Sequence, residues 1–405
     1  MCEDGLGAAV AQFAGETGAL GGEEGAAQLH ALYSGGKFGE FARMLAAQLP
    51  EIVAYEEEGD TAAVLAVMAS SVRVAPAEQQ EGLVADLCKQ LTADTSAEGN
   101  AEARLRGLLK VFAFSTLPAA KLASLVVALG YAQATAQREA VLPVVGSLSA
   151  LEKAWGASAA EMRPLRLAAA DLLWPVGEPA AACGAEALEQ LERYLSSFGE
   201  GDAALAEAAP AASRAVAGLV ACEGVYGSDL LGLPAVRQLS GSTDDSRGGA
   251  VELLDIFLTG RYGDYAALIK KRPGLLAALG LEAEAAGRRM RLQSLAALAA
   301  AAPDATMSYA DIAADLQVED GEVEEWVVEA IGADVFVASI DQLAAKVMAS
   351  KVARRTFGGD DWKVLRERLG AWRASIAEVA EHVARYSTAA AKATATRVTA
   401  KAETA

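Results

Sequence analysis

Side chains that could bind a metal or transfer protons are few in this chain, and they lie far apart. The thiols and imidazoles are those of Cys2, Cys88, Cys183, Cys222, His30 and His382. No two of the cysteines form a CxxC pair, so their spacing argues against a zinc site and supports no disulfide framework. The sequence therefore predicts reduced cysteines in an intracellular protein, with no metal site.

Motifs of the common catalytic classes are also missing. The sequence contains no GxSxG elbow, no P-loop and no HExxH pair. GEGDAA at 199–204 imitates the start of a dinucleotide fingerprint, but it follows the helical segment LERYLSSF instead of a strand, so we expect a loop. The neighbouring acids Asp360 and Asp361 suit the N-terminal end of a helix, where the helix dipole favours negative charge. These observations predict a protein that is not an enzyme and needs no cofactor.

The composition indicates a soluble protein of two or three structural units. The chain has 405 residues, of which 22% are charged, and a formal net charge of -19. This charge argues against a protein that coats nucleic acid or an anionic membrane. The start, MCEDGLGAAV, is acidic and unlike a secretory signal, and the apolar stretch LASLVVALGYA is too short to cross a bilayer. We therefore expect a cytoplasmic protein without a membrane partner.

Helical periodicity dominates the chain after an acidic, glycine-rich N-terminal segment at residues 1–60. From 61 to 302, segments such as ARLRGLLKVFAF, AKLASLVVALGYA and EALEQLERYLSSF place apolar residues three and four positions apart. Helix breakers separate these segments at Pro118, Pro143, Pro164 and Pro234. Helices that follow one another with almost no strand signal predict a mainly α fold, an irregular helical-repeat solenoid.

The pattern changes at residues 303–358, which predict a winged helix. Ser308 and Asp311 are spaced like a helix-capping pair, and Ile312 and Leu316 on the same helix are expected to be buried. A second helix has one apolar face, made by Val323, Trp326, Val327, Ala330 and Ile331. VFVASI, the polar turn DQLAA and KVMASKVARRTF then indicate a β-hairpin.

A heptad seam marks the last predicted helix, at residues 359–387, which precedes an Ala-rich tail at 388–405. The apolar residues of the seam recur in alternating steps of three and four: Trp362, Leu365, Leu369, Trp372, Ile376, Val379, Val383 and Tyr386. Either the seam folds back on the chain's own helical stack, or it joins a helical bundle with other subunits. We favour the bundle, because a strict 3.5-residue repeat suits a long partner helix better than a curved stack, which needs a wider stripe.

The free energy available from the seam is large enough for subunit assembly. Burying each large apolar side chain contributes roughly 1.5–3 kcal/mol, so the whole seam supplies on the order of 10 kcal/mol as an upper value. Arg366, Arg368 and Arg373 flank the seam and would select acidic neighbours.

The second helix of the predicted winged helix is too acidic to read DNA. Its acids are Glu319, Asp320, Glu322, Glu324, Glu325 and Glu329. No Lys or Arg occurs between Arg291 and Lys346. Phosphates would repel such a helix, so we expect no DNA partner. The strand edges of the hairpin suit pairing with a neighbouring subunit instead.

A basic cluster lies on or just after the second strand of the hairpin, at Lys346, Lys351, Arg354 and Arg355. In one interpretation these charges protect an exposed strand edge. In the other they contact ribosomal RNA or an acidic partner. Phe357 is the one aromatic residue beside the cluster, which gives stacking on single-stranded nucleic acid little support.

The order of helical stack, winged helix and terminal helix resembles the PCI domain shared by subunits of the proteasome lid, the COP9 signalosome and translation initiation factor 3. Within residues 250–386, three segments also resemble the M-subunit family of eukaryotic translation initiation factor 3: LLDIFLTGRYGDY, LGLEAEAAGRRMRLQSLAALA and RRTFGGDDWKVLRERLGAW. The matching positions are Leu253, Leu254, Ile256, Phe257, Tyr265, Leu279, Gly280, Leu281, Met290, Arg291, Leu292, Arg355, Thr356, Phe357, Gly358, Trp362, Leu365, Leu369 and Trp372.

This resemblance implies a non-catalytic scaffold subunit of translation initiation factor 3 that supports initiation on the small (40S) ribosomal subunit. The implied partners are other PCI- and MPN-domain subunits, met through the wing and the terminal helix, with ribosomal RNA as a further contact. A PCI subunit of the COP9 signalosome is the alternative within the same fold. A free-standing winged-helix regulator that binds nucleic acid is the alternative from another class.

Overall fold

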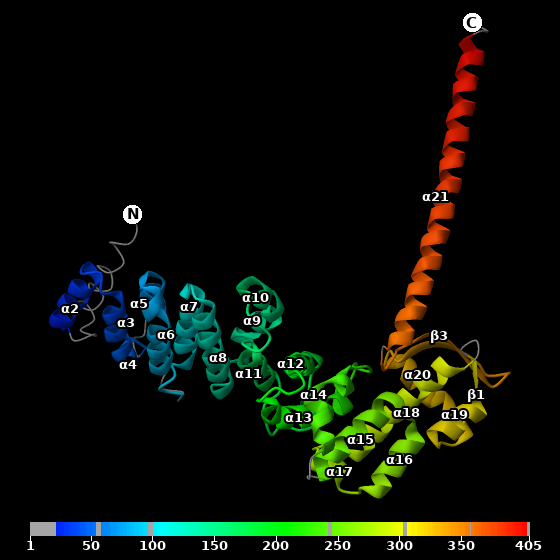
Figure 1. Cartoon of the computed structure of the whole chain (residues 1–405), viewed down its shortest axis with the longest axis horizontal. Helices are drawn as coiled ribbons and strands as arrows, with labels where there is room; N and C mark the ends of the chain where they lie inside the picture. Colours follow the sequence, from blue (N-terminus) through cyan, green and yellow to red (C-terminus); the bar gives the residue numbers. More distant parts are fainter. Residues whose placement is uncertain are drawn as a thin grey trace. The chain divides into compact units, whose positions relative to one another are not determined.

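The computed structural model describes residues 22–53, 58–95, 100–241, 245–302, 306–356 and 358–402. The chain divides into two compact units, Met1–Ala353 and Arg354–Ala405. In the described residues, the first unit holds a stack of helices followed by a small sheet, and the second holds one long helix (Figure 1). The predicted mainly α fold class is confirmed.

The helical stack contains short antiparallel helices in chain order. They are α2 (Gly22–Ser34), α3 (Phe38–Ala47), α4 (Leu49–Val53), α5 (Glu58–Val74), α6 (Ala77–Leu91), α7 (Ala101–Phe114), α8 (Pro118–Ala134), α9 (Leu142–Gly146), α10 (Leu148–Trp155), α11 (Arg163–Leu173), α12 (Ala185–Ser196), α13 (Ala209–Ala221), α14 (Pro234–Arg237), α15 (Asp245–Thr259), α16 (Tyr262–Lys271), α17 (Leu275–Ala278) and α18 (Ala283–Ala301). The predicted breakers Pro118, Pro143, Pro164 and Pro234 lie in the first turns of α8, α9, α11 and α14. Proline is tolerated there because its missing N–H would have no intrahelical partner.

Three hydrophobic clusters follow one another along the first unit. The first runs from Leu29 to Leu172, the second from Ala170 to Met290, and the third from Leu292 to Val347. Helix α11 contributes to the first and second clusters, and α18 contributes to the second and third. Sharing of helices between successive cores is typical of a solenoid, in which each repeat buries its apolar face against its neighbours. The stack already includes α2 to α4, so the change in composition near residue 60 does not coincide with a change in architecture.

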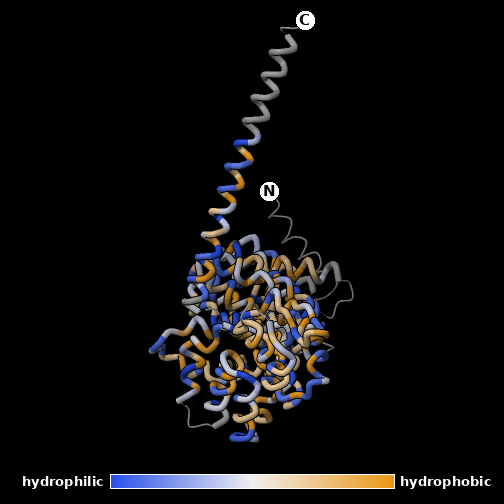
Figure 2. The backbone as a smooth tube through the Cα atoms, turned by 90° about the vertical axis from the view of Figure 1, so that its right-hand side faces the viewer, coloured by the Kyte–Doolittle hydropathy of each residue, from blue (hydrophilic) through white to orange (hydrophobic). Residues whose placement is uncertain are grey.

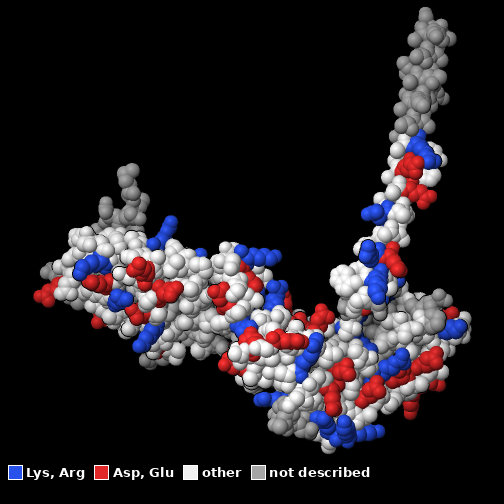
Figure 3. Space-filling model, viewed as in Figure 1, with Lys and Arg blue, Asp and Glu red and all other residues white. Residues whose placement is uncertain are grey.

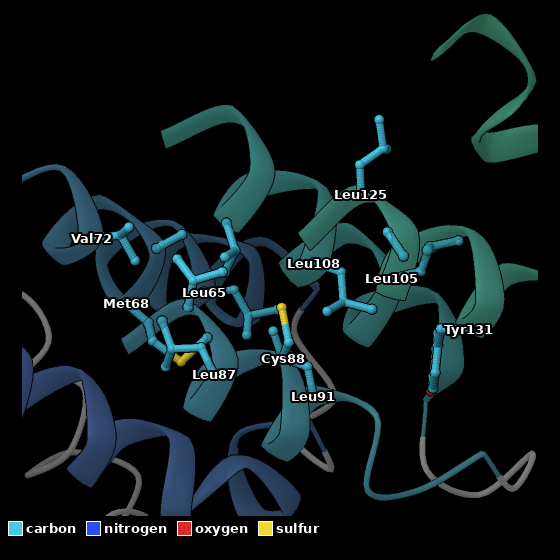
Figure 4. Packing of buried hydrophobic residues seen from close by; sticks show 14 of the residues in the cluster. Leu65, Met68, Val72, Leu87, Cys88, Leu91, Leu105, Leu108, Leu125 and Tyr131 are labelled. Atoms are coloured by element: carbon cyan, nitrogen blue, oxygen red, sulfur yellow. The ribbon is translucent and has the colours of Figure 1, made fainter. Parts of the chain in front are cut away.

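Close packing in the first cluster depends on a glycine at a helix contact. Leu65 of α5, Leu87 of α6 and Leu108 of α7 converge in the space between these helices (Figure 4). A Cβ atom added at Gly107 would lie 2.9 Å from Cδ2 of Leu91 and 3.4 Å from Cδ2 of Leu65. A larger residue at Gly107 would therefore push α7 away from α5 and α6.

The winged helix follows the stack. It consists of β1 (Thr306–Ser308), α19 (Tyr309–Leu316), the 3-10 turn η8 (Asp320–Glu322), α20 (Val323–Gly332), β2 (Phe336–Asp341) and β3 (Lys346–Val352). The strands form an antiparallel sheet in the order β1-β3-β2, with Met307 opposite Val347 and Asp341 opposite Lys346. The predicted hairpin is confirmed, but the sheet has a third strand, β1, that the sequence pattern did not indicate.

The predicted start of α19 is confirmed. The N–H of Asp311 donates to Oγ of Ser308 at 3.2 Å, so Ser308 caps the helix, and Ile312 and Leu316 are both fully buried. On α20, Val323, Val327 and Ala330 are likewise fully buried, while Trp326 and Ile331 are half-buried against the same core.

The second unit contains the long helix α21 (Gly359–Ala402), which continues beyond residue 387, where the sequence predicted an Ala-rich tail. The N–H of Gly358 donates to Oδ2 of Asp361 at 2.9 Å, so Asp361 satisfies one of the free donors at the start of the helix. Arg354 forms an ion pair with the same carboxylate. Among the helices that the structure describes, none is both long and apolar enough to cross a membrane.

Candidate subunit interface

The heptad seam of α21 is exposed along its whole length. The exposed fraction of its side chains runs from 37% at Leu365 to 73% at Tyr386. In Figure 2, hydrophobic positions alternate with hydrophilic ones along the described part of the helix. An α-helix with apolar residues three and four positions apart presents them along one side, so the seam is a continuous apolar stripe. Its use as a subunit interface remains a prediction.

Charged side chains lie on both sides of this stripe. Arg366, Arg368 and Arg373 are all exposed. Figure 3 shows basic and acidic side chains interspersed with uncharged ones along the described part of α21. His382, the histidine on this helix, is exposed as well. Such flanking charges select partners in coiled coils through ion pairs across the interface.

The sheet of the winged helix has two different edges. Strand β2 is an edge strand along its whole length, and β1 covers only the Lys346–Met348 part of β3. Three apolar side chains around β2 and β3 are exposed: Val337 at 48%, Met348 at 45% and Leu343, in the turn, at 102%. Among the described strands, the outer edge of β2 has no partner, and pairing of this edge with another subunit stays a prediction.

The four residues of the predicted basic cluster have different environments. Lys346 lies where β3 is paired on both sides, whereas Lys351 lies beyond the end of β1. Both lysines are exposed, and neither forms an ion pair with another residue in the described part of the chain. Arg354 is paired with Asp361, and Arg355 is only 9% exposed. Of the two lysines, Lys351 therefore lies on a part of β3 that β1 leaves unpaired, where a charge could protect a strand edge, whereas Lys346 does not.

The acids of α20 and η8 divide into two groups. Glu324 accepts hydrogen bonds from Tyr309 Oη and Gln342 Nε2, both at 2.9 Å, so it ties the hairpin turn to α19. Glu329 forms an ion pair with Arg288 of α18. The others, Glu319, Asp320, Glu322 and Glu325, are exposed. This exposed acidic surface would repel phosphates, as the sequence predicted.

Two arginines of α18 connect the helical stack to the winged helix, and sequence reasoning did not assign them this role. The guanidinium of Arg291 lies 4.2 Å from the ring centre of Tyr262 and 5.2 Å from that of Trp326. Arg291 also donates to Oη of Tyr262 at 2.7 Å and to the carbonyl of Leu316 at 3.2 Å. One cation thus joins α16, α18, α19 and α20.

The second arginine, Arg289, is 7% exposed and donates to the carbonyl of Val225. Its guanidinium lies 5.5 Å from the ring centre of Tyr226, whose Oη donates to the carbonyl of Ala333 at 2.7 Å. Burial lowers the pKa of Arg289 and raises that of Tyr226. The partners are far apart in the sequence, so no local pattern could have identified this junction.

Arg291→Met should lower the free energy of unfolding of the winged helix by about 2–3 kcal/mol. The change removes two aromatic contacts of the guanidinium and two hydrogen bonds. Arg288→Met is the matched control on the same helix, because it breaks an exposed ion pair with Glu329 that contributes about 1 kcal/mol or less. Amide hydrogen exchange over residues 306–352 measures both effects. Equal losses in the two variants would contradict the role of Arg291.

In the parts of the chain that the structure describes, no group of three or more His, Cys, Asp or Glu side chains lies close enough together to hold a metal ion. The chemistry that the described surfaces support is recognition: an apolar helix stripe with basic flanks, and a strand edge with two exposed lysines nearby.

Two family models match the chain at these surfaces. Residues 275–351 match the PCI domain, and residues 355–381 match the model described as eIF3 subunit M, C-terminal helix. The predicted resemblance to the M-subunit family is thereby confirmed. The matched residues include the end of the helical stack, the winged helix and the seam of α21 as far as Val379.

Curated relatives named eukaryotic translation initiation factor 3 subunit M are similar to part of the chain. The protein of Dictyostelium discoideum is 33% identical over 187 residues, which cover 46% of this chain and 46% of that protein. The Schizosaccharomyces pombe protein is 31% identical over 148 residues, covering 36% and 35%. The Aspergillus terreus protein is 32% identical over 232 residues, covering 56% and 48%. The chain thus spans under half the length of each of these relatives.

Proposed function

We propose that this chain is a non-catalytic scaffold subunit of a translation initiation factor 3 complex and that it works in the cytoplasm. The observation that carries the proposal is the direct succession of a PCI domain and a subunit M type helix with an exposed heptad seam. The names of the relatives favour translation initiation over the COP9 signalosome.

Assembly would use two surfaces of the chain. The seam of α21 enters a bundle with helices of other PCI- and MPN-domain subunits, where its apolar side chains lose their exposure to water. The open edge of β2 pairs with a neighbouring wing through main-chain hydrogen bonds. The helical stack then projects as a binding arm, and the complex supports initiation on the small (40S) ribosomal subunit.

Contact with ribosomal RNA or an acidic partner would rest on Lys346 and Lys351. Both are exposed, whereas Arg354 is engaged by Asp361 and Arg355 is buried. Two lysines supply a weak, salt-dependent contact that adds to the assembly surfaces and does not replace them.

Affinity purification of the tagged chain from its own cells tests the proposal. We expect initiation factor 3 subunits and small-subunit ribosomal proteins to co-purify at moderate salt and to be identified by mass spectrometry. Signalosome subunits in their place would keep the fold and overturn the function. A chain recovered only as a monomer would overturn the scaffold role.

A further inference from the structure

The charged residues of α21 are distributed unevenly around the helix. The seam fixes the heptad, with Trp362 at position a and Leu365 at position d, so the residues at positions e and g border the apolar stripe. Between residues 366 and 382 these border positions hold Arg366, Arg368, Arg373, Ser375, Ala380 and His382. Over this range the border of the seam therefore carries three arginines and no acid.

The acids of the same stretch all lie on the side of the helix that faces away from the stripe. Glu367 and Glu381 occupy position f and Glu378 occupies position c, and all three are exposed. Glu381 forms an ion pair with Arg385, one turn further along on this outward side. A chain with a formal net charge of -19 thus places only basic charge beside its exposed stripe between residues 366 and 382.

The three border arginines have no anion within the chain. No acid lies three or four positions before or after Arg366, Arg368 or Arg373, so an ion pair between successive turns of the helix is not available to them. All three are exposed, and none forms an ion pair among the residues that the structure describes. Burial of the stripe would remove water from these guanidinium groups, so it favours a partner that supplies carboxylates.

A second copy of this chain does not meet that need. In a parallel pair of seams, Arg368 of one copy would face Arg373 of the other, and like charges repel. In an antiparallel pair, the arginines would face the far end of the seam, whose border positions hold Ser, Ala and His. Asp361, which borders the start of the seam, is already paired with Arg354. The partner is therefore a different chain.

Single-stranded RNA fits the stripe less well than a helix does. Trp362 and Trp372 could stack on bases beside the arginines. However, the stripe also contains Leu, Ile and Val, which offer no stacking surface. Its alternating steps of three and four residues match the knobs and holes of a partner helix over its whole length.

We propose that the first half of the seam, residues 362–373, binds a helix whose own border positions carry Asp or Glu, and that the three arginines select this helix by ion pairs across the interface. This inference rests on the proposed function, since it takes the seam as a subunit interface. Guanidinium and carboxylate groups match each other in bidentate pairs, which adds geometric selection to charge. The second half of the seam, with small border residues and His382, buries apolar area without selecting charge.

Two designed helical peptides test this selection on the full chain. Both carry the same Leu and Ile seam over about four heptads, and one has Glu and the other Lys at every border position, where like charges keep each peptide from pairing with itself. We expect the Glu peptide to bind at least about tenfold more tightly than the Lys peptide at low salt, measured by fluorescence anisotropy. The difference should shrink at about 1 M salt, where the Debye length is about 3 Å.

Charge reversal at the border should reverse the preference. Arg366→Glu, Arg368→Glu and Arg373→Glu together should make the Lys peptide the tighter ligand, again by about tenfold. A reversal of preference cannot come from loss of folding, because an unfolded chain would bind neither peptide.

The matched control adds the same three glutamates on the outward side of α21. Ala371→Glu, Ala374→Glu and Ala377→Glu occupy positions c, f and b, so this variant should keep the preference for the Glu peptide. An equal change of preference in the control would overturn the proposal, because it would show that net charge and not the border of the seam decides binding.

Three results with the unaltered chain would also overturn the proposal. The first is equal binding of the two peptides, or binding of neither. The second is a stable dimer of the isolated chain in sedimentation velocity, which would assign the seam to a second copy. The third is tighter binding of poly(U) than of the Glu peptide, which would assign it to RNA.

These outcomes are distinct from those of the affinity purification. If initiation factor 3 subunits co-purify with a chain that does not distinguish the peptides, the proposed function stands and this inference fails. If the chain prefers the Glu peptide but co-purifies with signalosome subunits, this inference stands and the proposed function fails.

Discussion

Leu365→Asp combined with Leu369→Asp should exclude the chain from its complex while leaving the folded monomer intact. Both side chains are exposed in the single chain, at 37% and 51%, so the substitutions remove nothing from the cores of the first unit. In a bundle the same residues would each contribute roughly 2 kcal/mol on burial, and the new carboxylates would resist desolvation. We expect association to weaken about 10³-fold or more, measured by co-purification with tagged partner subunits.

A matched double variant separates the seam from the helix that carries it. Val364→Asp with Ala371→Asp introduces the same charges on α21, two positions after Trp362 and two after Leu369, outside the apolar stripe. This control should lower helix propensity by a similar amount and still enter the complex. If the Leu365 and Leu369 variant enters the complex normally, the seam is not a bundle interface. Exclusion of the control variant to the same extent would contradict the interface as well.

Phe336→Ala should lower the free energy of unfolding of the winged helix by about 3–5 kcal/mol. Phe336 begins β2, is 2% exposed and packs in the third hydrophobic cluster, so its removal leaves a cavity between the sheet and the helices. Amide hydrogen exchange over residues 306–352 measures the change. A destabilised winged helix should also hold the edge of β2 less firmly, so we expect less of the chain to enter the complex.

The adjacent residue is the control. Val337 follows Phe336 on the same strand, but its side chain is 48% exposed because alternate residues of a strand point to opposite faces. Val337→Ala should cost about 1 kcal/mol or less. Comparable losses at the two positions would mean that the winged helix does not depend on the third cluster as described.

Much of the fold could be predicted because its signals are local. The Ser308–Asp311 spacing predicted the cap of α19, and the hydrogen bond between them is present. Apolar periodicity predicted the stack helices and the hairpin, and each prediction depends on residues within a few positions of one another. The continuous seam of α21 follows from the same rule, since one helix needs no distant partner to align its side chains.

Other features could not be predicted because they join distant segments. Strand β1 has only three residues, too few to show alternation, and becomes a strand through its pairing with β3. The same pairing changed the environment of Lys346, which the sequence allowed as an edge residue. Arg355, predicted as a contact for RNA or an acidic partner, is buried.

The sequence by itself determined the mainly α class, the winged helix, the acidic second helix and the apolar seam, because periodicity and charge are properties of neighbouring residues. Only the tertiary structure decided which arginines join the stack to the winged helix. Those contacts depend on how helices pack, and packing brings together residues whose separation along the chain carries no information about their distance in space.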